Sequence, residues 1–143
     1  MAETDQLQQR MVALIRAFGL LESGRTPCGQ PLSPSAAHAL TELSAAHSLT
    51  QSELGHRLRL EKSTVSRLVG QLEERGWIER CRAEHDARVM LLTLTDEGRG
   101  MANRVAASRT VFFAQLCDRI PPARRGNLLD SLELLIDVLH ERR

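Results

Sequence analysis

Two polar stretches in the middle of the sequence carry side chains suited to recognising phosphates and nucleobases. The second stretch, residues 82–95, reads RAEHDARVMLLTLT, so that Asp86 precedes Arg88 by two positions. Arginine presents a planar set of donors that matches phosphates and base edges. A carboxylate two residues away can accept from the guanidinium and fix its rotamer. This spacing predicts an arginine held in position for a ligand. The alternative is a surface ion pair, worth about 0–1 kcal/mol.

The first stretch, residues 61–76, reads EKSTVSRLVGQLEERG, and its apolar residues repeat at helical spacing. The opposite face of this predicted helix carries the candidate ligand-binding residues Lys62, Ser63, Thr64, Ser66 and Arg67. An α-helix fits the major groove of B-DNA, where Arg67 is suited to a bidentate contact with guanine worth about 1–3 kcal/mol of discrimination. Ser63 and Thr64 suit phosphate oxygens at a helix start. For a single helix of this kind, a solvated polar face is the alternative.

The elements around these stretches predict a winged helix-turn-helix. Thr50 and Glu53 form a capping box that begins a short helix just upstream, and two short helices joined by a tight turn make a helix-turn-helix. Next, the extended runs WIERCR and VMLLTLT, separated by AEHDA, predict an antiparallel hairpin. Such a wing lies beside the minor groove when the helix fills the major groove. Arg88 can then insert into the minor groove, and Arg82 and Arg80 on the first strand are expected at phosphates.

Further helices flank this region on both sides. Apolar residues at helical spacing predict a first helix over about residues 5–22, and Ser33 followed by Pro34 predicts the start of a second. Thr95 is expected to cap a long helix, which Pro121 ends before a last helix begins. The expected fold class is mainly α with a small β-wing.

Composition narrows the class of function. The chain has 143 residues, of which 42% are hydrophobic and 26% charged, as in a globular protein with its own core. No apolar run reaches the about 18 residues that a membrane helix needs, and the acidic, polar first residues do not form a signal peptide. A cytoplasmic location is therefore expected. Without a glycine-rich phosphate loop, a Ser/His/Asp arrangement or a metal motif, we expect no enzyme, no cofactor and no bound metal.

Three segments carry a resemblance to a known family: STVSRLVGQLEERGWIER, DAR and LLTLTDEGR. At these spacings the chain resembles the MarR family of bacterial transcription regulators over nearly its whole length. Two positions depart from the family pattern. Glu61 stands where relatives often have a neutral cap, and Arg59 stands where a small residue is common in the turn. An acidic residue beside DNA would slightly oppose phosphate.

The resemblance implies a winged helix-turn-helix DNA-binding lobe at residues 34–95 and a helical dimerisation region at residues 1–33 and 96–143. It also implies that Asp86 holds Arg88 for the minor groove. The terminal helices would pack with their counterparts in a second subunit, although their apolar stripes can instead cover the core of their own chain. A homodimer is expected to bind a palindromic operator, because two-fold symmetric proteins bind paired half-sites.

The function expected from the sequence is that of a dimeric, sequence-specific regulator of transcription that binds double-stranded DNA. Most of the family repress, so a repressor released by a small molecule or an oxidant is favoured. The alternative is a winged-helix module that binds proteins and does not read DNA, for which the small net charge of +1 is the only support. The presence of Arg67, Asp86 and Arg88 together argues against it.

Cys28 and His38 are the candidates for an effector or sensor site. Cys28 lies in a polar loop between Glu22 and His38. These three could form a partial zinc site, or the histidine could activate the thiol. Zinc-sensing relatives supply histidines from the long helix and oxidant-sensing relatives have tyrosines near the cysteine, and this sequence has neither. A loop cysteine and a packing histidine without an input role are the third alternative. Cys81 and Cys117 are expected to be buried thiols.

Overall fold

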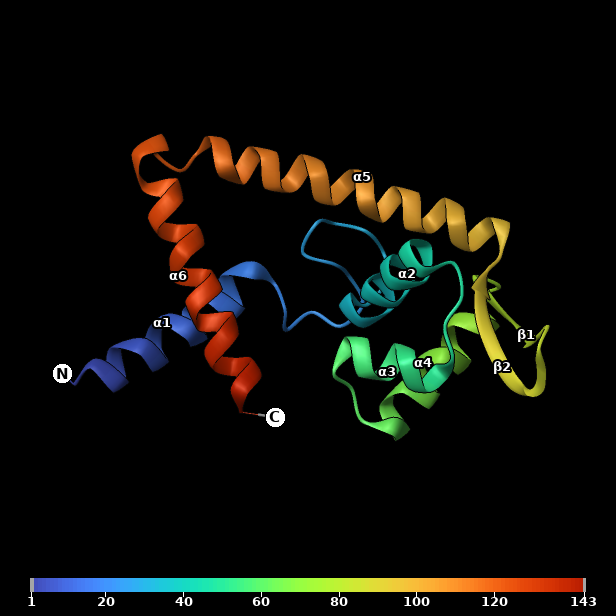
Figure 1. Cartoon of the computed structure of the whole chain (residues 1–143). Helices are drawn as coiled ribbons and strands as arrows, with labels where there is room; N and C mark the ends of the chain where they lie inside the picture. Colours follow the sequence, from blue (N-terminus) through green and yellow to red (C-terminus); the bar gives the residue numbers. More distant parts are fainter. Residues whose placement is uncertain (1, 143) are drawn as a thin grey trace. The chain divides into compact units, whose positions relative to one another are not determined.

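Six helices and one hairpin form the part of the chain that the computed structural model describes, residues 2–142 (Figure 1). In chain order these are α1 (Glu3–Phe18), α2 (Pro34–Ala46), α3 (Gln51–Leu58), α4 (Lys62–Glu74), β1 (Ile78–Ala83), β2 (Asp86–Leu94), α5 (Asp96–Asp118) and α6 (Pro122–Glu141). This order confirms the expected fold class, mainly α with a small β-wing. Contacts divide the chain into two units, residues 1–108 and 109–143, and α5 crosses the boundary. No helix within the described residues is long and apolar enough to cross a membrane.

Side-chain caps fix where three of the helices begin, as the sequence predicts. The Ser33 hydroxyl accepts from the Ala36 amide at 3.1 Å and begins α2. Thr50 begins α3 with a reciprocal capping box, in which its hydroxyl accepts from the Glu53 amide and the Glu53 carboxylate accepts from the Thr50 amide, both at 3.1 Å. The Thr95 hydroxyl accepts from the Gly98 amide at 3.0 Å before α5. Each bond satisfies an amide that lacks an intrahelical partner.

α1 ends earlier than its apolar spacing predicts. Gly19 has a φ of +86°, and its amide donates to the Arg16 carbonyl, while the Leu20 amide donates to the Ile15 carbonyl, both at 3.2 Å. A left-handed glycine at this position closes a helix because it turns the chain out of the helical path. The helix therefore stops at Phe18, and the apolar residues beyond it lie outside.

The buried core lies in the first unit and fixes α3 and α4 against α2 and the hairpin. Its largest fully buried side chains are Leu32, Leu40, Leu43, Leu54, Val65, Val69, Leu72 and Leu92. Burying one such side chain stabilises the fold by about 1.5–3 kcal/mol. α3 packs closely against α4 at Gly55, where an added Cβ would lie 2.9 Å from Cγ2 of Val65.

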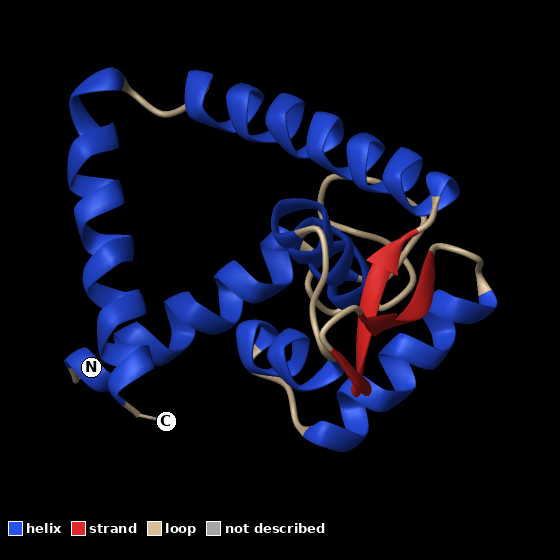
Figure 2. Ribbon diagram, turned by 45° about the vertical axis from the view of Figure 1, so that its right-hand side comes forward, coloured by secondary structure: helices blue, strands red, loops and turns tan. Residues whose placement is uncertain are grey.

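The strands β1 and β2 pair antiparallel directly after α4, and Figure 2 shows them in red. Ile78 pairs with Leu94 and Arg82 with Met90, and the register shifts after Arg82. The connecting loop contains only residues 84–85, so the predicted five-residue loop is wrong and Asp86 is the first residue of β2. The register shift allows a shorter loop between β1 and β2 than the pattern of apolar residues indicates.

A short bridge ties the hairpin to the segment before α3. The amide of Leu92 in β2 donates to the Leu49 carbonyl at 2.7 Å, and the Leu49 amide donates back at 3.2 Å. Because Thr50 caps α3 in the next position, this bridge links the start of the helix-turn-helix directly to the wing.

The two terminal helices, α1 and α6, contain no buried residue. The larger apolar side chains exposed on α1 are Leu7, Val12, Leu14 and Ile15. Those exposed on α6 are Leu128, Leu129, Leu132, Leu134, Ile136, Val138 and Leu139. For α1, which lies in the same unit as the buried core, the alternative in which its apolar stripe covers that core does not agree with the structure.

Candidate nucleic-acid interface

The polar face of α4 points outward while its apolar face is anchored in the core. Val65, Leu68, Val69 and Leu72 are buried. The predicted recognition residues Lys62, Ser63, Ser66 and Arg67 are exposed, and Thr64 is half-buried. The structure thus brings the predicted residues together on one accessible helical face. The buried side fixes the rotation of the helix about its axis, so that face is presented in a defined direction.

The turn that leads into α4 contains both departures from the family pattern. Arg59 is the C-cap of α3 and adopts the left-handed conformation, with a φ of +56°. A non-glycine residue in that conformation carries a steric cost of roughly 1–2 kcal/mol. Glu61 is the N-cap residue of α4, but its side chain makes no capping hydrogen bond. Its exposed carboxylate therefore stands at the helix start, among the recognition residues.

Two adjoining depressions lie beside this face of α4. One, of about 480 Å³, lies between α3 and α4 and is lined by Gln51, Ser52, Gly55, His56, Leu60, Lys62 and Val65. The other, of about 520 Å³, is lined by Gln51, Glu61, Lys62, Ser63 and Ser66. Gln51 and Lys62 belong to both. Gln51 was missed in the sequence, where its only signal is its place directly after the Thr50 cap.

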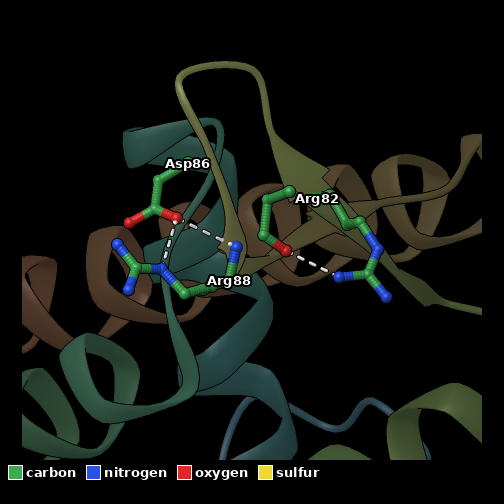
Figure 3. A network of polar contacts seen from close by, with 4 residues as sticks. Arg82, Asp86 and Arg88 are labelled. Carbon is green, nitrogen blue, oxygen red and sulfur yellow. Dashed lines mark hydrogen bonds and ion pairs between the residues drawn. The ribbon is translucent and has the colours of Figure 1, made fainter.

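The wing contains the predicted pairing of Asp86 with Arg88 (Figure 3). One carboxylate oxygen, Oδ1 of Asp86, accepts from the Arg88 amide at 3.0 Å and from its Nε at 3.3 Å. The Arg88 side chain is 92% exposed and that of Asp86 39%. The aspartate therefore fixes both the backbone and the guanidinium of an arginine that otherwise projects into solvent. This confirms the predicted contact.

The two other arginines of the wing are engaged with the protein itself. Nη1 of Arg82 donates to the Ala87 carbonyl at 2.6 Å, which braces the end of the hairpin (Figure 3). Arg80 forms an ion pair with Glu73, with Nε 2.9 Å from Oε1, and its Nη1 donates to Oε1 of Gln51 at 3.4 Å. Both arginines are exposed, but Arg80 also contacts both helices of the helix-turn-helix.

The proposed sensor residues lie outside the helix-turn-helix and the wing. Cys28 is half-buried in the loop between α1 and α2, and His38 is exposed on α2. The Thr26 amide donates to the Gln30 carbonyl and the Gln30 amide donates to the Thr26 hydroxyl, both at 3.0 Å, which closes the loop around Cys28. Within residues 2–142, no three His, Cys, Asp or Glu side chains form a group able to hold a metal, so Glu22, Cys28 and His38 do not assemble a zinc site.

The cysteines form no disulfide. Cys81 and Cys117 are exposed, so the expectation that they are buried is wrong. In β1 only the first and last residues are buried, which leaves Cys81 on the surface. In α5 the buried residues end at Val105, twelve positions before Cys117.

Comparison with known proteins agrees with this geometry. The sequence model of the MarR family matches residues 30–89, which include α2, α3, α4, β1 and the start of β2. Over these residues the chain matches the MarR family.

The curated relatives of this chain are named as transcriptional regulators, which agrees with the expectation of a regulator rather than an enzyme. It is 30% identical over 101 residues to the HTH-type regulator YdgJ of Bacillus subtilis, an overlap of 71% of this chain and 62% of the relative. It is 35% identical over 90 residues to TtmR of Methylorubrum extorquens, an overlap of 62% of this chain and 45% of the relative. The chain thus spans less than two thirds of these relatives.

Solved structures resemble the chain along almost its whole length. NMB1585, a MarR family regulator from Neisseria meningitidis, is 27% identical with a TM-score of 0.71, covering 99% of this chain and 96% of that one. Streptococcus pneumoniae FabT, solved in complex with DNA, has a TM-score of 0.84 at 21% identity, covering 99% of this chain and all of that one. At that identity the likeness to FabT shows the fold alone.

Proposed function

We propose that this protein is a dimeric regulator of transcription that binds double-stranded DNA at a specific sequence. The observation that carries the proposal is the outward polar face of α4, followed directly in the chain by a hairpin. On this hairpin Asp86 holds the exposed Arg88. A helix of this kind fits the major groove, and its N-terminal residues reach the base edges. Arg88 then lies at the adjacent minor groove, where a narrow groove concentrates negative potential.

Each exposed side chain has a role in this proposal. Arg67 makes a bidentate contact with a guanine, because its planar fork matches O6 and N7. Lys62, Ser63, Thr64 and Ser66 contact phosphates or base edges near the start of α4, where unpaired amides also favour an anion. Arg82, braced by the Ala87 carbonyl, contacts a phosphate on the minor-groove side. FabT, a protein of the same fold, has been solved in complex with DNA, which supports DNA as the ligand.

A second copy of the chain is the proposed partner of the exposed apolar residues on α1 and α6. Exposed apolar stripes on otherwise unburied helices are typical of surfaces that associate. Two-fold symmetric winged helices bind half-sites about one turn of DNA apart. We therefore expect a homodimer that recognises a palindromic operator, with residues 34–95 as the DNA-binding lobe and residues 1–33 and 96–143 as the dimerisation region.

Regulation by an effector completes the proposal. The PcaV regulator of Streptomyces coelicolor, a structural neighbour at 23% identity, has been solved with its natural ligand. We infer a repressor whose DNA affinity falls when a small molecule binds or when Cys28 is oxidised. The half-buried position of Cys28 leaves the thiol route open, whereas the scattered metal-binding side chains do not support zinc.

The proposal is tested by titrating the purified protein with the DNA upstream of its own gene at two salt concentrations. We expect preference over random DNA and a steep loss of affinity with salt, because each phosphate contact releases counterions. A protein without any sequence preference at either salt concentration, including on a random pool, would instead be a winged-helix module for binding other proteins.

A further inference from the structure

Arg80 connects the wing to both helices of the helix-turn-helix. It lies on β1, and its guanidinium reaches Glu73 near the end of α4 and Gln51 at the start of α3. The ion pair is short, 2.9 Å, and only 38% and 35% of the Arg80 and Glu73 side chains are exposed. Partial burial lowers the screening of this pair by solvent. Glu73 therefore holds the guanidinium where its other end meets Gln51.

The contact with Arg80 decides which way round the amide of Gln51 lies. A guanidinium carries only donors, so the group that faces it must be the amide oxygen, Oε1, at 3.4 Å. The amino group, Nε2, is then the end directed away from Arg80. Gln51 lines both depressions beside α4, together with Lys62. The N–H groups of Nε2 are therefore available to a ligand that lies in these depressions.

We propose that Gln51 donates through Nε2 to a DNA phosphate beside α4, and that Arg80 is its positioning residue, anchored by Glu73. This inference rests on the proposed DNA-binding function. It adds one DNA contact, made by Gln51, and gives Arg80 the role of positioning Gln51. Neutral amides donate to phosphate oxygens in many protein–DNA complexes, and the first helix of a helix-turn-helix crosses the DNA backbone. In this proposal Arg80 acts through Gln51, because two of its three guanidinium nitrogens, Nε and Nη1, are engaged with Glu73 and Gln51.

The test compares operator affinity across a series of salt concentrations for Arg80→Ala, Gln51→Ala and the double variant. Each single variant should weaken binding by about tenfold or more, the value of one hydrogen bond to a charged group. The double variant should be no weaker than either single one, since both remove the same contact. The salt dependence should not change. If Arg80 contacts a phosphate directly, the slope of log K against log salt falls by about 0.9 for Arg80→Ala, and the two losses add.

Gln51→Glu separates a donor from a structural support. A carboxylate accepts from Arg80 at least as well as an amide, but it has no donor and repels phosphate. The proposal predicts that Gln51→Glu binds the operator more weakly than Gln51→Ala. Binding as tight as that of the unmodified protein would overturn it, because Gln51 would then serve only to hold Arg80.

Two further variants keep the test decisive. Glu73→Gln loosens Arg80 without removing it, and serves if Arg80→Ala does not fold; its loss of affinity should again not add to that of Gln51→Ala. Arg57→Ala removes the comparable ion pair between Arg57 and Glu42, 3.1 Å, which does not reach Gln51, and should leave affinity unchanged. An unmodified protein without operator preference overturns the proposed function and this inference together. If the unmodified protein prefers its operator but the losses of affinity of the Arg80 and Gln51 variants add, this inference alone is overturned.

Discussion

Replacing Asp86 by alanine tests the positioning of Arg88 separately from the charge of Arg88. The substitution leaves Arg88 in place but removes the carboxylate that accepts from its amide at 3.0 Å and from its Nε at 3.3 Å. If Asp86 keeps the guanidinium ready for the minor groove, the variant should fold normally and bind DNA more weakly. Arg88→Ala, which removes the guanidinium itself, should bind more weakly still.

The exposure of the pair sets the expected magnitudes. The Arg88 side chain is 92% exposed, and exposed ion pairs contribute about 0.2–1 kcal/mol to stability. The free energy of unfolding should therefore fall by at most about 1 kcal/mol. Fixing a mobile arginine costs roughly 1.5–2 kcal/mol of side-chain entropy. Without Asp86 that entropy is lost when DNA binds, so the dissociation constant should rise by up to about 30-fold.

Fluorescence anisotropy with a labelled operator measures the affinity, and urea denaturation measures the stability of the same samples. Asp96→Ala is the matched control, because it removes an exposed aspartate–arginine pair, Asp96 with Arg99 at 2.9 Å, at the start of α5 rather than at the tip of the wing. It should leave DNA affinity unchanged. A folded Asp86→Ala variant that binds as tightly as the unmodified protein would refute the holding role of Asp86. A loss of DNA affinity no larger than that of Asp96→Ala would also refute this role.

Three further changes have defined outcomes. Arg67→Ala should relax base preference at one position of each half-site in a binding-site selection; a uniform loss over all sequences would mark Arg67 as a phosphate contact. His47→Gly should raise the free energy of unfolding by about 1 kcal/mol in urea denaturation, because His47 has a φ of +67° and such strain costs about 1–3 kcal/mol; a less stable variant would contradict this. Cys28→Ser should still bind the operator but lose any response to a thiol oxidant, and a variant that still responds would exclude Cys28 as the sensor.

Features set by neighbouring residues could be predicted from the sequence. The caps at Ser33, Thr50 and Thr95 are present because each joins atoms three residues apart, and such bonds depend little on the rest of the fold. The contact of Asp86 with Arg88 belongs to the same class, since it spans two residues. The buried and exposed faces of α4 also follow from spacing alone.

Features that depend on tertiary contacts could not be predicted in this way. Arg80 was expected at a phosphate, because nothing local shows that Gln51, 29 positions away, meets its guanidinium. The short loop of the wing was missed because the register shift after Arg82 is not encoded in the alternation of apolar residues. The exposure of Cys117 was missed because the apolar stripe of α5 continues beyond the part of that helix that is buried.

Selection of bound sequences from a pool of random double-stranded DNA tests the central claim most directly. The account predicts enrichment of a palindrome whose half-sites lie about 10 base pairs apart. For Arg88→Ala it predicts loss of preference at the A·T-rich positions flanking each half-site, where a narrow minor groove would receive the arginine. A pool that stays random after repeated rounds with folded protein would contradict DNA reading by α4 and the wing.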